Sequence, residues 1–313
     1  MNLGISACLL GQEVRYDGTH KLDHYLRDEL GRFVVWEAVC PETECGLGVP
    51  REAMRLIDTP RGIRLRTINT ALDHTDRMQG WITKKLEQLA KLDLRGFVFK
   101  SKSPSSGMAG VKLYPEGGGQ PQPKGVGLFA GAFMERFPLV PVIDEGRMHD
   151  PGLRENFIER IFAYDRWPTY CAEDGSAAGL ISFHARHKLL LMAHSEKHMR
   201  GLGRLVAGIK GKPSAAVLDQ YAVEFMDGMR LLATVKKHTN VLDHAAGYFK
   251  RALPADAKAE LGGAIRDFHD GRLPLVVPIT LIRHYTRLYK EPYLSGQWYF
   301  DPQPAELMLK YHA

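Results

Sequence analysis

The sequence predicts an α/β N-terminal domain, mostly a parallel sheet with helices, followed by an all-α C-terminal domain. In the first half, short apolar runs rich in β-branched and aromatic residues alternate with stretches of helical periodicity. From Leu180 on, the pattern is almost wholly helical, and Gly or Pro separates the periodic segments. A chain of 313 residues is long for a single hydrophobic core, so two domains are the natural expectation.

The apolar runs of the first half are interpreted as strands. They cover residues 3–7, 33–39, 63–68, 96–101 and 139–144. Helical periodicity predicts helices at 76–92 and 126–136, and residues 20–30 form an amphipathic stretch. Residues 115–124 are rich in Gly, Pro and Gln and are interpreted as a flexible surface loop. Polar segments that directly follow strands are where α/β proteins usually place their chemistry.

A domain boundary is expected at residues 145–151. We therefore assign residues 1–150 to the α/β domain, 151–178 to a helix and linker, and 179–313 to the all-α domain. The helices of this last part are expected at 180–202, 215–232, 239–253, 256–270 and 279–284. The sequence contains no internal repeat.

Composition favours a protein of the reducing cytoplasm. The chain is 44% apolar and 25% charged, as in ordinary globular proteins. It has no run of about 18 apolar residues, so no membrane span is expected. The N-terminus lacks the basic region and cleavage site of a signal peptide. In a protein that is not exported, four cysteines indicate metal binding or catalysis more often than disulfides.

The charge is unevenly distributed along the chain. Residues 1–150 hold 20 Lys and Arg against 19 Asp and Glu, whereas residues 151–313 hold 22 against 17. Nine of the 13 histidines also lie in the second part. A basic second half suggests a polyanionic partner, most simply nucleic acid. A solvated basic surface without a partner is the alternative.

Three of the cysteines lie where strands are expected to end. Cys40 and Cys45 flank the acid Glu42 in the segment VCPETECGLGVPR, and Cys8 follows the first predicted strand. The Pro and Gly residues around Cys40 predict a shaped loop and not a helix or strand interior. The spacing lacks CxxC and so excludes a zinc ribbon or a thioredoxin motif. A Cys-x4-Cys step occurs in some iron–sulfur sites, but cysteines are also often buried as small hydrophobic residues.

The segments around these thiols resemble a known family. SACLLGQEVRYDG, VCPETECGLGVPRE and FKSKSPSSGM, in that order, are similar to the thiouracil desulfidases (TudS, DUF523). The second half, with LLLMAHSEKHMRGLGRLVA, KKHTNVLDHAAGYFKRAL and GRLPLVVPITLIRHYTRL, resembles the YbgA-like domain, DUF1722. Together the two resemblances cover nearly the whole chain. The combination is similar to the subfamily associated with removing sulfur from 4-thiouridine in tRNA.

The resemblance implies a [4Fe-4S] cluster on three cysteines, with one iron open to the substrate sulfur and hydrolysis without net redox. Two ligands transfer directly onto Cys8 and Cys40. Stand-alone desulfidases generally carry a cysteine where this chain has Ser106, and they generally lack a counterpart of Cys45. We therefore infer Cys45 as the third ligand from the number of thiols. Cys171, alone in the expected linker, is interpreted as a bystander.

Residues near the thiols suit this reaction. A base must activate water, and Glu42 lies between two of the expected ligands; its alternative role is a carboxylate that stabilises the loop. Ser101 and Ser103 follow a buried strand and could orient the ring carbonyl or relay a proton, although turn capping is their ordinary role. Lys100 and Lys102 could contact phosphate, but an exposed lysine is the usual case.

Histidines and basic residues in the second half suggest a surface for RNA. His187, His194 and His198 share a predicted helix face, but no acid or cysteine joins them at ligand spacing, so a metal site is disfavoured. We expect this face to be polar and basic and to contact RNA backbone. The residues assigned to RNA binding are Arg186, Lys188, Lys197, Arg200, Arg204, Lys236 and Lys237.

The predicted function is the desulfidation of 4-thiouridine in tRNA by a cytoplasmic iron–sulfur enzyme. Thiolated tRNA is the expected partner, with no membrane and no obligatory protein partner. One alternative is desulfidation of free thiouracil or a thionucleotide. Another is an iron–sulfur accessory protein that binds nucleic acid without catalysis.

Overall fold

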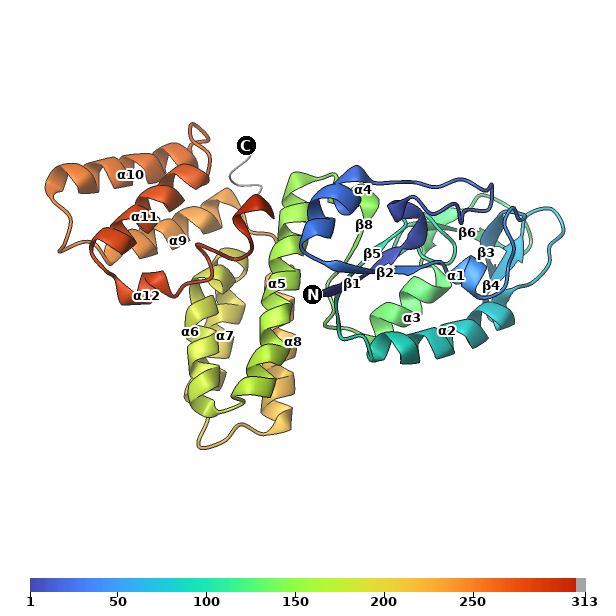
Figure 1. Cartoon of the computed structure of the whole chain (residues 1–313), viewed down its shortest axis with the longest axis horizontal. Coiled ribbons are helices and arrows are strands. Elements are labelled where there is room, and N and C mark those ends of the chain that lie inside the picture. The colour runs from blue at the N-terminus through green and yellow to red at the C-terminus, as the bar shows by residue number, and fades with distance from the viewer. Residues whose placement is uncertain (308–313) are drawn as a thin grey trace. The chain divides into compact units, whose positions relative to one another are not determined.

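The computed structural model describes residues 1–307. The chain folds into two compact units, the first spanning Met1–Asp150 and the second beginning at Pro151 (Figure 1). In the described part of the chain, no helix has both the length and the apolar character needed to cross a bilayer. The first unit is α/β and the second is helical, as predicted.

A sheet of four parallel strands forms the centre of the first unit. Its strands, in spatial order, are β2 (Val35–Val39), β1 (Asn2–Ser6), β5 (Leu94–Phe99) and β8 (Val142–Asp144). Every residue of β5 is buried, which explains why this strand is a nearly continuous apolar run. Gly4 is needed for close packing, because a Cβ there would lie 2.1 Å from Cδ2 of Phe97.

A second sheet of mixed direction completes this unit. Its strands, in spatial order, are β4 (Gly62–Thr67), β3 (Met54–Thr59), β6 (Val111–Pro115) and β7 (Gln122–Gly125). Only β4 was predicted. The expectation of a loop throughout 115–124 is wrong at both ends, because Pro115 belongs to β6 and residues 122–124 belong to β7. Residues 122–124 are Gln, Pro and Lys and are exposed, so they show no β-branched or aromatic pattern that would predict an edge strand.

Two predicted helices pack in the first unit. α2 (Thr75–Ala90) and α3 (Leu128–Arg136) contact each other (Figure 1). Phe133 of α3 packs on β5, with ring centroids 4.8 Å from Phe97 and 5.6 Å from Phe99. Offset and edge contacts between aromatic rings add to the free energy of burial. This aromatic cluster fixes the position of β5 and therefore the start of the loop that follows it.

Short helical turns follow the parallel strands and shape the loops at their ends. These turns are η1 (Ala7–Leu10), α1 (Pro41–Glu44) and α4 (Glu145–Met148). The prediction of a loop without helix after Cys40 is therefore wrong. Cys40 is the extended N-cap and Pro41 begins one helical turn, which suits a proline because its fixed φ matches the first helical position. The expected boundary after Asp144 also contains a helix.

The second unit is a set of helices. They are α5 (Pro151–Glu173), α6 (Ala177–His194), α7 (Glu196–Ala207), α8 (Ala215–Arg230), α9 (Val235–Gly247), α10 (Ala255–His269), α11 (Val276–Leu288) and α12 (Pro292–Ser295). The expected helix and linker at 151–178 is mostly the single helix α5, which includes Cys171. The segment 180–202 contains two helices, because Ser195 is extended and its hydroxyl caps α7.

Candidate active site

The four parallel strands end along one edge of the sheet, and the segments that follow β1, β2 and β5 line a cavity of about 370 Å³. Ser6 pairs with Val39, and Phe99 pairs with Asp144, so the strand ends are neighbours. β2 lies on one side of β1 and β5 lies on the other, so the direction in which strands are added to the sheet reverses at β1. This is the arrangement at which open α/β sheets bind their ligands. The polar residues that line the cavity include Cys8, Arg15, Cys40, Glu42, Arg51, Lys100, Ser101, Lys102, Ser103, Ser105 and Ser106.

Two of the three predicted ligand thiols line this cavity. Cys8 lies in η1 and is buried, and burial raises the pKa of its thiol to about 11 although the nearby Lys100 opposes the shift. Cys40 ends β2, and its Sγ donates weakly to the carbonyl oxygen of Val14 at 3.8 Å. The backbone N–H of Cys40 donates to Oε1 of Glu44 at 2.8 Å, which fixes the start of α1. Both thiols therefore have defined positions at the carboxyl edge of the sheet.

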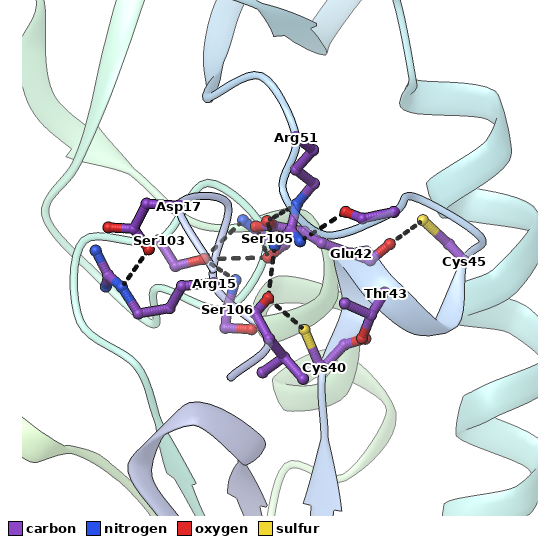
Figure 2. A network of polar contacts seen from close by, with 12 residues as sticks. Arg15, Asp17, Cys40, Glu42, Thr43, Cys45, Arg51, Ser103, Ser105 and Ser106 are labelled. Atoms are coloured by element: carbon purple, nitrogen blue, oxygen red, sulfur yellow. Dashed lines mark hydrogen bonds and ion pairs between the residues drawn. The ribbon is translucent and has the colours of Figure 1, made fainter. Parts of the chain in front are cut away.

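The third predicted thiol is not among the residues that line the cavity. Cys45 ends α1, and its Sγ donates to the carbonyl oxygen of Glu42 at 3.3 Å (Figure 2). Burial raises the pKa of this thiol. Ser106 does line the cavity and is only 4% exposed. Among residues 1–307, no three Cys, His, Asp or Glu side chains are arranged to hold a metal ion. Cys171 is an exposed residue of α5 in the other unit.

Glu42 lies at the centre of a network of polar contacts (Figure 2). Its Oε2 accepts from Nε of Arg51 at 3.0 Å and also from Nη2 of the same guanidinium. Its Oε1 accepts from the hydroxyl of Ser105 at 2.8 Å. Arg51 also donates to the carbonyl oxygens of Val14 and Gly48, which ties the network to two loops. The carboxylate is therefore oriented toward the cavity and held on both oxygens.

The serine loop after β5 is closed by its own hydrogen bonds. The hydroxyl of Ser103 accepts the backbone N–H groups of Ser105 and Ser106 at 3.3 and 3.1 Å, as a turn-capping serine does. A Cβ at Gly107 would lie 2.7 Å from the carbonyl oxygen of Ser103, so only glycine fits there. Sequence reasoning chose Ser103 for its chemistry, but the hydroxyl that contacts Glu42 is that of Ser105.

Ser101 is held by an acid that the sequence did not reveal. Glu145, the first residue of α4, accepts from the backbone N–H of Ser101 at 2.6 Å and from its hydroxyl at 2.7 Å. It also forms an ion pair with Lys100. These contacts lower the pKa of Glu145 despite its burial, which raises it. The contacts arise because β5 and β8 are neighbouring strands, and the sequence alone gave no signal of that pairing.

The residues assigned to RNA binding have different surroundings. Lys197, Arg204 and Lys236 are exposed, and Lys188 is half-buried. Arg200 is exposed and pairs with Glu196. Arg186 stacks on Trp298, and Nζ of Lys237 donates to two backbone carbonyl oxygens.

The histidines of the second half do not form the expected polar face. His184, His187 and His194 are all buried, at 8%, 0% and 1% exposure. The expectation is wrong because α6 packs these positions into the helical core. His198 belongs to α7, beyond the break at Ser195.

Comparisons with known proteins agree with this division of the chain. The model of the 2-thiouracil desulfurase family matches residues 3–145, and that of the DUF1722 family of proteins of unknown function matches residues 188–304. The uncharacterized protein YbgA of Escherichia coli (strain K12) is 33% identical over 156 residues, which are 49% of this chain and 90% of that protein. A solved structure described as the [4Fe-4S]-dependent thiouracil desulfidase TudS is 26% identical. It covers 48% of this chain and 93% of its own, with a TM-score of 0.39.

Proposed function

Because this chain belongs to the YbgA family and carries a 2-thiouracil desulfurase domain before its DUF1722 domain, we propose that it removes sulfur from 4-thiouridine in tRNA. The reaction replaces the C4 sulfur of the pyrimidine by the oxygen of water and releases sulfide, with no net change of oxidation state. One observation carries the proposal. Cys8, Cys40 and Glu42 meet the serine loop in a single cavity at the carboxyl edge of the parallel sheet.

The proposed cofactor is a [4Fe-4S] cluster held by Cys8, Cys40 and a third ligand. Thiolates are the donors that iron–sulfur clusters require, and both cavity thiols come from ordered strand ends. When bound, the cluster supplies an iron without a protein ligand that can bind the soft thiocarbonyl sulfur as a Lewis acid. Cys45 is proposed as the third ligand because a thiolate is a softer donor than the hydroxyl of Ser106.

The present hydrogen bond of Cys45 is compatible with that role. The thiol donates to the carbonyl oxygen of Glu42, and a thiolate has no proton to donate. Metal binding deprotonates cysteine ligands and would therefore release this sulfur from the carbonyl. Ser106 is the competing candidate, because it already lines the cavity with Cys8 and Cys40.

Glu42 is proposed as the group that takes a proton from the attacking water. Arg51 and Ser105 fix the direction of its carboxylate, so that little rearrangement is needed in the reaction. Ser105 is then a positioning residue, because its hydroxyl donates to Oε1 of Glu42 and so holds the carboxylate in place. Lys100 can donate a hydrogen bond or a proton to the departing sulfide, and its contact with Glu145 keeps it beside Cys8. Of the two predicted roles of Ser101, we retain that of a proton relay, because its hydroxyl already donates its one hydrogen to Glu145 and has none for the ring carbonyl.

The second unit is proposed to bind the tRNA backbone. Its excess of Lys and Arg over Asp and Glu, 22 against 17, supports this assignment, as do its exposed basic residues Lys197, Arg204 and Lys236. A phosphate contact needs an accessible cation, which these three side chains provide.

The proposal is tested by anaerobic reconstitution and nucleoside analysis of treated tRNA. We expect loss of 4-thiouridine, an equal gain of uridine, and release of sulfide. Iron-loaded protein that converts only free thiouracil would be a desulfidase of small substrates. Iron-loaded protein that converts neither substrate would be an accessory protein without this activity.

A further inference from the structure

The cationic side chains that line the cavity differ in whether they have an acidic partner. Four of them line it, namely Arg15, Arg51, Lys100 and Lys102. Arg51 pairs with Glu42, Lys100 pairs with Glu145, and Arg15 lies 3.4 Å from a carboxylate oxygen of Asp17. Within residues 1–307, Lys102 forms no ion pair or hydrogen bond through its side chain. The cavity rim therefore has one uncompensated positive charge.

Lys102 is also held in an unusual backbone conformation. Its φ is +58°, a left-handed value that lysine rarely adopts. The residues on both sides fix this conformation, because Glu145 binds Ser101 and the hydroxyl of Ser103 binds two backbone N–H groups. Backbone strain that the surroundings maintain at a cavity rim is a reason to look for a function. The unpaired ammonium group of Lys102 is therefore presented by a loop that its own hydrogen bonds keep in a strained conformation.

The exposure of Lys102 indicates what kind of anion it can meet. Lys100 is largely buried beside Cys8, at the level of the proposed cluster, with its side chain 19% exposed. Lys102 is exposed and lies further along the loop, so it faces whatever enters the cavity from solvent. A thiolated pyrimidine is uncharged at neutral pH, whereas the phosphate of its nucleotide is anionic and is well bound by lysine.

We propose that Lys102 binds the phosphate of a thiolated nucleotide whose base enters the cavity. The inference rests on the proposed function and names the substrate group that the first unit recognises besides the base, a phosphate of a mononucleotide or of RNA. It assigns a task to the first unit that is separate from the capture of RNA by the second. Lys102 is thus a specificity residue, and free thiouracil should lack one contact that a nucleotide makes.

The test compares Lys102→Gln with the control Lys84→Gln in iron-loaded protein. Glutamine keeps the length of the side chain and has a similar cost in the left-handed region, so the loop should be retained. Lys84 is an exposed lysine of α2 that does not line the cavity. Three small substrates are used: 4-thiouracil, 4-thiouridine and 4-thiouridine 5′-monophosphate. A short RNA that contains 4-thiouridine forms a fourth arm.

We expect Lys102→Gln to lose about tenfold in kcat/KM on phosphate-bearing substrates, mainly through KM, with little change on the base and the nucleoside. Lys102→Arg should restore most of the loss, and Lys84→Gln should behave as the parent. Loss on the mononucleotide identifies its 5′-phosphate as the ligand, and loss on RNA alone identifies a backbone phosphate. Either result supports the proposal.

Direct binding separates this inference from the proposed function. Uridine 5′-monophosphate and uridine, which contain no sulfur, are titrated calorimetrically into the iron-loaded proteins. The parent should prefer the monophosphate about tenfold, and Lys102→Gln should lose that preference. If no thiopyrimidine is converted, the proposed function fails while this comparison still decides the role of Lys102. Equal loss on all substrates, lost iron, or an unchanged phosphate preference in both assays would overturn the inference.

Discussion

Replacing Glu42 by glutamine tests both the chemistry and the architecture of the site. Glutamine keeps the shape of the side chain but removes its charge and its ability to accept a proton. Its amide oxygen can still accept both hydrogen bonds from Arg51, and its NH2 group can donate to Ser105. The variant therefore loses the charge–charge attraction of the ion pair, while the hydrogen bonds and the loop contacts of Arg51 remain.

The size of both effects follows from these contacts. The side chains of Glu42 and Arg51 are 14% and 9% exposed, so the pair is mostly desolvated. Removing one partner of a fully buried pair costs about 3–5 kcal/mol, and the remaining hydrogen bonds reduce this to about 2 kcal/mol. For a unit of this size, that corresponds to a decrease in Tm of roughly 4–8 °C. Loss of a general base should reduce the rate by about 10²-fold or more.

The assay measures iron content, turnover of 4-thiouridine in tRNA, and thermal unfolding of the metal-free protein. Glu116→Gln is the matched control, because Glu116 pairs with Arg66 on the second sheet, away from the cavity. Exposed pairs contribute little, so this control should keep its rate and lose less than about 1 kcal/mol. A near-normal rate for Glu42→Gln would remove Glu42 as the base. An unchanged Tm would refute the energetic role of its contact with Arg51.

Three further predictions concern iron, RNA and pH. The loaded protein should contain about four irons per chain; Cys8→Ala, Cys40→Ala and Cys45→Ala should each lose most of them, and Cys171→Ala should not. Full iron in Cys45→Ala with loss in Ser106→Ala would instead assign the third ligand to Ser106. Neutralising Lys197, Arg200 and Arg204 together should raise KM for tRNA in a salt-dependent manner and leave KM for 4-thiouracil unchanged. An equal loss of activity on both substrates would exclude an RNA-binding role for these three residues. Burial lowers the pKa of His184 from 6.5 to about 4, so the folded state favours the neutral ring. The stability that depends on the neutral ring is fully present above pH 6.5 and is lost as pH falls through about 4. The Tm of the parent should therefore decrease more steeply than that of His184→Gln over this range, and parallel curves would contradict the assignment.

The sequence was sufficient to predict an element where a local pattern of residues reflects a physical requirement of the fold. The run through Phe97 and Phe99 is apolar because β5 is buried on both faces, and the periodicity of residues 76–92 matches the buried face of α2. Cys8 and Cys40 could be placed at a common site because both follow parallel strands, whose carboxyl ends lie at one edge of a sheet. Their placement thus required only that the two segments be recognised as strands and that the chain direction be known, and both can be read from a sequence.

Other features depended on which strands are neighbours and on which way side chains point. Glu145 lies 44 residues from Ser101 in the chain, and only the pairing of β5 with β8 brings its carboxylate to the serine loop. Ser105 and Ser103 have the same chemistry, and the closed turn alone decided which hydroxyl contacts Glu42. The buried histidines were misplaced because helix packing, and not their own polarity, determines their exposure. The sequence by itself thus determined the fold class and the edge of the sheet where the thiols lie. Only the tertiary structure decided the contacts within the cavity, because these require strand order and side-chain direction that no local pattern encodes.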